Sequence, residues 1–446
     1  MRARLLPPHF FAVRVPTLLA IFWRAHIARP KITGANRSGP LSFIILRLDA
    51  LGDVVLTTPI FRALKAAHPR SRCTVVVQKS YKSLLATNPH IDEILTLPVI
   101  RPKWLPQGLR RLLSALFFYW TKLRHRQFDF AISPRWDLDE HLATFLCVMS
   151  GAASRVGYSE QASAAKRVAN RGFDRAYDIC LPPGPIRHEI QRNMAVCEAL
   201  GASRDDTWLD IHITEHDRRR AARLLAKVPP GAKLVALGIG AQSAGRRWPL
   251  QRYATVIARL QFTYRVWPVI VCSEAELGEA LKLAALLPEK PVIVSGARLR
   301  DVGAVLERCA LFIGNDSGCA HLAAAVGCKM VVISRHPLNG DPNHFNSPVR
   351  FAPHGRDVRV LQPASGRDNC AQACRVGGPH CILQVSADEV AATAQEMLRR
   401  RHSVAPQPLT ANHLDTALQA LVGGHSARGL RAATEAIKRV DPRAFA

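Results

Sequence analysis

The sequence of 446 residues lacks several signatures that would assign its class directly. It has no G-x-G-x-x-G fingerprint and no Walker sequence, so neither a dinucleotide cofactor nor a P-loop is favoured. RRM, KH and zinc-finger signatures are also missing, which argues against nucleic acid as a partner. No uncharged apolar run reaches the roughly 18 residues that a membrane-spanning helix requires.

Acidic residues are scarce in this chain. Asp and Glu number 34 against 61 Lys and Arg, which gives a formal net charge of +27. Such an excess predicts attraction to nucleic acid, acidic lipid headgroups or phosphorylated glycans. The hydrophobic content of 48% and the charged content of 21% are otherwise typical of globular proteins. Because the length exceeds what one core usually organises, we expect two domains.

The N-terminal residues 1–31 are basic and rich in aromatic and aliphatic side chains. Arg14 and Pro16 interrupt the apolar part, and no small-residue cleavage site is clear, so the segment is a poor secretory signal. It is predicted to be a basic amphipathic surface segment that touches a membrane, or else to be disordered. Without a signal peptide the eleven cysteines are expected to be mostly reduced. We therefore predict a cytoplasmic protein. A peripheral position on the inner face of the cytoplasmic membrane is compatible with this prediction.

Strands and helices alternate with short connections in both halves of the chain. In the first half, strands are predicted at residues 41–46, 73–77, 94–97, 128–133 and 155–158. The second half repeats the pattern from residue 233 onward, and the chain becomes irregular after residue 335. This alternation predicts an α/β protein with two Rossmann-like, doubly wound domains facing across a substrate cleft. The predicted divisions are a basic extension 1–40, domains 41–225 and 226–402, and a basic tail 403–446.

Residues 104–126 carry leucines and aromatic residues at helical spacing, surrounded by basic residues. One interpretation is a domain helix that packs on the sheet and has a solvated basic face. The other is a membrane-surface patch, because helices that combine aromatic and basic residues favour anionic interfaces. We favour the domain helix as the main role, with the patch as an addition.

The most informative stretch is IGNDSGCAHLAAAVG, residues 313–327. An apolar strand leads through a glycine-bearing turn directly into a helix, which places free backbone N–H groups at the positive end of a helix dipole. Asp316 is unexpected beside an anion. It either caps the helix or accepts hydrogen bonds from sugar hydroxyls while the following amides hold a phosphate. The local sequence alone favours the cap.

Three cysteines, Cys370, Cys374 and Cys381, form a cluster without a CxxC pair. His380 is a possible fourth metal ligand, but it directly precedes Cys381 and has awkward geometry for that role. A cysteine-rich packed loop is favoured over a metal site.

Several motifs occur together in the order and spacing of one enzyme family. They are LDALGDVVLTTPIFRALKAAHP (48–69), FDFAISPRWD (128–137), SRVGYSE (154–160), HEIQRNMAVCEALG (188–201), RRWP (246–249), GNDSGCAHLAAAVG (314–327) and SPVRFAP (347–353). Over about residues 41–402 the chain resembles the lipopolysaccharide heptosyltransferases, the ADP-heptose glycosyltransferases. The joint match is specific, whereas any one motif would be weak.

The resemblance implies a GT-B fold with the acceptor on the N-terminal domain and the nucleotide-sugar on the C-terminal domain. It further implies an inverting transfer of heptose from ADP-heptose to the lipopolysaccharide core that needs neither metal nor cofactor. The implied acceptor is an anionic, lipid-linked glycan, which gives the positive charge a purpose. Nucleic acid is not an expected partner.

The resemblance also implies roles for acceptor-side residues. Asp53 matches the general base that takes the proton of the acceptor hydroxyl, although an acidic residue in a first helical turn also stabilises the helix dipole. Gly52, Arg135 and Asp137 are implied acceptor-side groups.

On the donor side, Arg246 matches a Lys that usually neutralises the diphosphate, and the departure leaves open whether Arg246 or Arg247 does so. The remaining implied donor-site residues are Asp316, Ser317, Gly318, Cys319 and His321, with Glu274 or Glu276 at the ribose.

Two alternatives remain open. The first is another nucleotide-sugar donor or another glycan acceptor within the same family. The second is a non-catalytic protein that binds anionic glycan or nucleic acid through its charge, which an intact Asp53 and Asp316 argue against.

Overall fold

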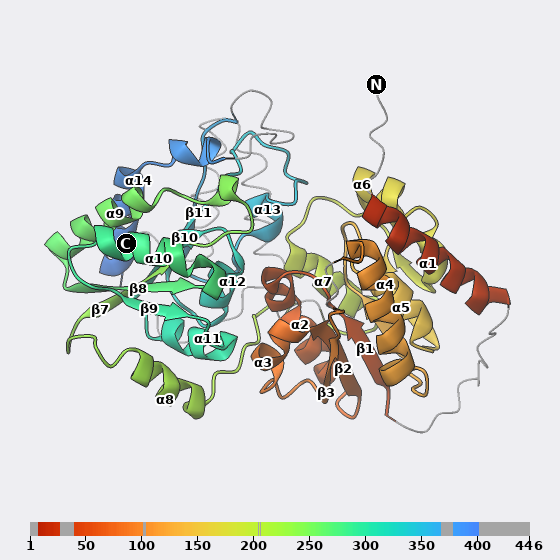
Figure 1. Cartoon of the computed structure of the whole chain (residues 1–446). Helices are drawn as coiled ribbons and strands as arrows, with labels where there is room; N and C mark the ends of the chain where they lie inside the picture. Colours follow the sequence, from red (N-terminus) through yellow and green to blue (C-terminus); the bar gives the residue numbers. More distant parts are fainter. Residues whose placement is uncertain are drawn as a thin grey trace. The chain divides into compact units, whose positions relative to one another are not determined.

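A computed structural model describes residues 8–26, 40–100, 104–203, 205, 207–366 and 378–400. The chain divides into two compact units. The first unit comprises the described residues within Met1–Pro185 and Ile190–Asp206, and the second those within Ile186–Glu189 and Thr207–Ala446. Each unit contains one parallel six-stranded sheet with helices packed around it (Figure 1). The predicted α/β class with two doubly wound units is therefore confirmed.

In the first unit the strands follow the order β3-β2-β1-β4-β5-β6. These strands are β1 (Ser42–Leu46), β2 (Arg72–Gln78), β3 (Glu93–Leu97), β4 (Phe130–Ser133), β5 (Ser154–Tyr158) and β6 (Ile179–Leu181). The helices are α1 (Pro8–His26), α2 (Leu51–Ala67), α3 (Lys82–Leu85), α4 (Gln107–Phe118), α5 (Ala143–Met149), α6 (Ala164–Ala169) and α7 (Glu189–Glu198). Ile44 and Ile45 of β1 point to opposite faces and are both fully buried, as expected of a central strand covered by helices on both sides.

The second unit has the strand order β12-β11-β10-β7-β8-β9. Its strands are β7 (Lys233–Gly238), β8 (Val266–Cys272), β9 (Val292–Ser295), β10 (Leu311–Asn315), β11 (Met330–Ile333) and β12 (Val358–Leu361). The helices are α8 (Glu215–Leu224), α9 (Leu250–Thr263), α10 (Leu277–Leu286), α11 (Leu299–Glu307), α12 (Gly318–Ala325), α13 (Pro348–Phe351) and α14 (Ala387–Arg399).

Both sheets have the same topology, and this topology predicts where ligands bind. Counted within each unit, the first strand lies between the second and the fourth. The order in which successive strands are added to the sheet therefore reverses between β1 and β4 and between β7 and β10. Ligands of open parallel sheets bind outside the carboxyl ends of the strands at such a switch point. The segments that matter are therefore those that follow β1, β4, β7 and β10.

Some elements differ from the sequence-based expectation. β12 lies in the stretch predicted to be irregular after residue 335, where it pairs in parallel with β11. β6 was not predicted either; both strands have at most four residues, too short for a clear periodic pattern. The chain enters the second unit at Thr207, earlier than the predicted start at 226, because α8 packs against α11.

The two basic amphipathic segments are helical where the structure describes them. α4 packs against β3 and α1, which confirms the domain-helix interpretation, and it continues as a π-helical turn, Tyr119–Leu123. α1 packs against α4 and α5, so residues 8–26 are an ordered surface helix and the alternative of disorder is wrong for them. Within the described ranges no helix is both long and apolar enough to cross a bilayer. The tail 403–446 lies outside the described residues.

Candidate functional site

In the first unit, the segment after β1 brings Asp53 to the first turn of α2. Its Oδ2 accepts a hydrogen bond from the backbone N–H of Ala50 at 3.3 Å, so the carboxylate fixes the helix start as well as facing the switch point. Gly52, which precedes it, is buried at the beginning of the same helix.

Two guanidinium groups hold the Asp53 carboxylate. The fully buried Arg47 donates from Nη2 to Asp53 Oδ1 at 3.0 Å, and Arg135, from the segment after β4, lies 3.6 Å from the same oxygen. Asp49 completes the cluster, 3.4 Å from Arg47 and 3.2 Å from Arg135. The structure thus brings together the predicted Asp53 and Arg135 and adds Arg47 and Asp49, which the sequence reasoning did not single out.

Asp137 does not join this cluster. Its Oδ1 accepts hydrogen bonds from the Leu138 N–H and the Ser163 hydroxyl, so it shapes the loop after β4. Lys166 supports the same loop, because its buried ammonium donates to the carbonyls of Arg135, Trp136 and Tyr158. Burial lowers the pKa of Lys166 to about 8.

In the second unit, the segments after β7 and β10 join Arg246 to Asp316. Arg246 Nη2 donates to the Asp316 carbonyl oxygen and lies 3.2 Å from Asp316 Oδ2. No side chain caps α12 at Ser317, so the interpretation of Asp316 as a helix cap, which the local sequence favours, is wrong. Burial raises the pKa of Asp316, while the Arg246 guanidinium opposes that shift.

Asn315, the last residue of β10, stabilises this turn through side-chain hydrogen bonds. Its buried side chain accepts hydrogen bonds from the Trp248 backbone N–H at 3.0 Å and the Tyr253 hydroxyl at 3.1 Å, and donates to the Ile239 carbonyl at 2.7 Å. It therefore connects β10 to the RRWP segment. An amide at the end of an otherwise apolar strand is the signal by which the sequence could have revealed it.

The start of α12 presents backbone donors beside Asp316. The first amides of a helix, here those of Gly318 and Cys319, have no acceptor within the helix. His321 follows one turn later, and its Nδ1 is buried with no hydrogen-bond partner among the described residues. Burial, with His188 and Arg246 nearby, lowers the pKa of His321 to about 3, so the imidazole is neutral at neutral pH.

A cavity of about 670 Å³ adjoins the same segment in the second unit. Its lining includes Gly240, Arg247, Trp248, Leu250, Glu276 and Leu286. Glu276 lies against Gly240, where any side chain would clash with its carboxylate, and it also accepts hydrogen bonds from Ser273. Glu274 is exposed, bends toward Gly296 and is not part of this lining. The volume and largely apolar walls fit a nucleoside-sized ligand.

The two adjacent arginines thus have different surroundings. Arg246 faces the Asp316 turn, whereas Arg247 lines the cavity and donates from its guanidinium to the Ala241 carbonyl at 3.2 Å. Of the two arginines between which the sequence did not decide, Arg246 is the one whose guanidinium lies at the start of α12.

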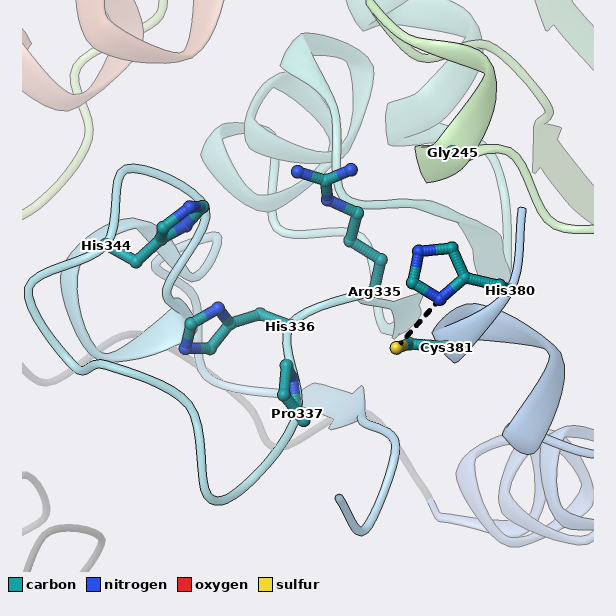
Figure 2. A pocket seen from close by; sticks show the side chains of 7 residues that line it. All are labelled: Gly245, Arg335, His336, Pro337, His344, His380 and Cys381. Atoms are coloured by element: carbon teal, nitrogen blue, oxygen red, sulfur yellow. Dashed lines mark hydrogen bonds between the residues drawn. The ribbon is translucent and has the colours of Figure 1, made fainter. Parts of the chain in front are cut away.

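A smaller pocket, with a volume of about 20 Å³, has Gly245 in its wall (Figure 2). Arg335, His336 and His344 line it together with His380 and Cys381, and the Cys381 sulfur lies 3.1 Å from His380 Nδ1. Burial lowers the pKa of His336 to about 4. Cys370 and Cys374, the other members of the predicted cysteine cluster, lie outside the described residues.

Comparisons with known proteins point to one enzyme family. The profile of glycosyltransferase family 9 (heptosyltransferase) matches residues 117–336. The lipopolysaccharide core heptosyltransferase OpsX of Haemophilus influenzae is 25% identical over 328 residues, covering 72% of this chain and 84% of that protein. Lipopolysaccharide heptosyltransferase 3 of Escherichia coli is 24% identical, covering 64% of this chain and 78% of that protein.

Solved structures share the fold. Glycosyltransferase family 9 from Veillonella parvula superposes with a TM-score of 0.64 at 21% identity, covering 81% of this chain and 97% of that one. The Escherichia coli heptosyltransferase WaaC with ADP gives a TM-score of 0.59 at 16% identity, covering 80% and 100%. Two Rossmann-like units are the GT-B fold, which these solved structures share, and the family profile and the relatives make the chain a glycosyltransferase. Within that class, the chain is of the heptosyltransferase type: it matches the profile of glycosyltransferase family 9 over residues 117–336 and is similar to lipopolysaccharide heptosyltransferases over most of its length.

Proposed function

We propose that this enzyme transfers a heptose from ADP-heptose to the lipopolysaccharide core, with inversion at the anomeric carbon and without a metal ion. The observation that carries the proposal is in the second unit, where Arg246 pairs with Asp316 at the start of α12 and the next residue, Arg247, lines a nucleoside-sized cavity. The heptosyltransferase names of the relatives indicate the sugar and the acceptor.

The second unit would hold the donor. In this assignment the cavity takes the adenosine, and Glu276 accepts hydrogen bonds from the ribose hydroxyls. The amides of Ser317, Gly318 and Cys319 and the Arg246 guanidinium hold the diphosphate, because a helix N-terminus and a cation both stabilise negative charge. His321 offers its unpartnered Nδ1, and Asp316 accepts hydrogen bonds from the sugar.

The first unit would hold the acceptor and the base. Asp53 takes the proton as the acceptor oxygen attacks the anomeric carbon, and the bond from that carbon to the diphosphate oxygen breaks. ADP leaves with the bonding electron pair, and Arg246 and the α12 amides stabilise its new charge in place of a metal. Arg135 positions Asp53 and binds anionic groups of the acceptor, while Gly52 lets the acceptor approach the helix start and Asp137 shapes the adjoining loop.

The excess of positive charge suits an anionic acceptor embedded in a membrane. We therefore place the enzyme in the cytoplasm, at the inner face of the cytoplasmic membrane.

Titration calorimetry tests the donor assignment. ADP-heptose is expected to bind in the presence of EDTA, ADP to bind more weakly, and UDP- and GDP-sugars to bind far more weakly. If the protein instead preferred a UDP- or GDP-sugar, the fold assignment would stand but the donor assignment would be wrong. Binding of none of them would favour a non-catalytic protein that recognises anionic glycans.

The ribose contact can be tested with a matched pair of variants. Glu276→Gln is expected to weaken ADP binding by about tenfold, because one charge-assisted hydrogen bond is lost from the cavity. Glu274→Gln, two residues earlier and outside the cavity lining, is expected to bind ADP like the parent protein. The reverse result in the same calorimetric titrations would move the ribose site to Glu274.

A further inference from the structure

α1 exposes an apolar stripe on the surface of the first unit. Val13, Thr17 and Ala20 are buried against the unit, whereas Leu19 and Phe22 on the opposite side are 63% and 57% exposed. Val15 and Trp23 extend the exposed stripe at helical spacing. Scattered apolar residues are common on surfaces, but a continuous stripe along a helix marks an interaction site.

A second stripe lies on the neighbouring helix. α1 packs side by side with α4, and together they cover one flank of the unit (Figure 1). Phe117 of α4 is 57% exposed and Trp120 of the following π-helical turn is 62% exposed. We define the α1–α4 face by its exposed apolar residues, which are Val15, Leu19, Phe22, Trp23, Leu109, Leu116, Phe117 and Trp120.

Basic residues predominate around these stripes, although Asp139 and Glu140 lie near Arg111 and Asp178 lies near Arg24. The first acidic residue of the entire chain is Asp49, and residues 94–128 contain none. α4 and its π-helical turn carry Arg110, Arg111 and Lys122, and the Arg124 guanidinium stacks over the Trp120 ring at 4.3 Å. α6, which contacts α1, adds the exposed Arg167 and has no acidic residue.

We propose that the α1–α4 face docks the protein onto an anionic lipid bilayer, with both helices lying in the plane of the interface. Aromatic and aliphatic side chains enter the headgroup region while the arginines and lysines pair with acidic headgroups. A second copy of the chain is a poorer occupant, because two faces rich in basic residues would repel each other. The proposal does not depend on the identity of the donor.

Vesicle co-sedimentation of the full chain tests this directly. The parent protein is expected to bind vesicles of phosphatidylcholine mixed with phosphatidylglycerol, and to bind pure phosphatidylcholine much more weakly. For the triple variant Leu19→Ser/Phe22→Ser/Trp120→Ser, the partition coefficient onto the mixed vesicles is expected to fall by a factor of about ten or more. As a matched control, Phe262→Ser in α9 of the second unit removes a side chain that is 95% exposed and is expected to bind like the parent.

Further readouts separate this proposal from folding defects and from the proposed activity. All replaced side chains are exposed, so thermal unfolding of the variants is expected to match the parent, and transfer to a water-soluble, delipidated acceptor is expected to remain unchanged. Brominated lipids are expected to quench tryptophan fluorescence of the parent and less that of Trp23→Phe/Trp120→Phe. Equal vesicle binding by parent and triple variant, or a dimer that the triple variant dissociates, would overturn the proposal.

Discussion

Replacing Asp53 with Asn is expected to lower kcat for heptosyl transfer by a factor of about 10² to 10⁴, because an amide cannot take the acceptor proton. The Asn side chain keeps one acceptor oxygen, which can retain the hydrogen bond that Arg47 donates to Oδ1 at 3.0 Å, whereas the longer bond from the Ala50 N–H to Oδ2, at 3.3 Å, is lost. Donor affinity is expected to stay the same, since the donor groups belong to the second unit. Initial rates and calorimetry with the nucleotide measure the two effects separately.

Asp49→Asn is the matched control for this variant. Asp49 pairs with the same two arginines, at 3.4 and 3.2 Å, so its loss disturbs the same buried charges. Both variants are expected to lose stability by about 1–3 kcal/mol in urea unfolding. Asp49→Asn is nevertheless expected to keep kcat within about tenfold of the parent. Equal losses of kcat in both would mean that the charge cluster, and not a base at Asp53, supports the reaction.

Arg246→Met should have the second largest effect, a decrease in kcat of about 10² to 10³. The variant removes the cation that lies 3.2 Å from Asp316 Oδ2 at the start of α12, the place that we propose for the departing diphosphate. It also leaves the buried Asp316 carboxylate without that partner, so thermal unfolding should accompany the kinetics. Single-turnover rates at saturating donor isolate the chemical step.

Two neighbouring variants test the specificity of that effect. Arg246→Lys keeps the charge and is expected to retain kcat within about tenfold. Arg247→Met removes a side chain of the cavity wall and is expected to raise KM for the donor while leaving kcat nearly unchanged. If Arg247→Met lowered kcat as strongly as Arg246→Met, the diphosphate assignment would have to include both arginines.

The fold was largely predictable because its core strands are long and continuously apolar. β1 and β2 lie within one residue of the predicted bounds 41–46 and 73–77. β6 and β12 were missed because short, half-exposed edge strands carry little periodic signal. The chain enters the second unit earlier than predicted because α8 is mostly charged and gives little hydrophobic pattern, and its packing on α11 assigns it to that unit.

The candidate site was predictable where motifs carried it and not where geometry alone does. Asp53, Arg135, Arg246 and Asp316 meet at the two switch points, as parallel topology requires. The capping interpretation of Asp316 failed because its partner, Arg246, lies 70 residues away in sequence. That Glu276 and not Glu274 lines the cavity likewise depends on the direction of the side chain, which local sequence does not encode.

The most direct test of the central assignment is a transfer assay with ADP-heptose and a heptose-deficient lipopolysaccharide acceptor in the presence of EDTA. The new linkage would be analysed by NMR of the purified product. We predict full turnover, release of ADP, and an anomeric configuration opposite to that of the donor. A requirement for divalent metal, retention of configuration, or transfer only from a sugar with another nucleotide would contradict the account.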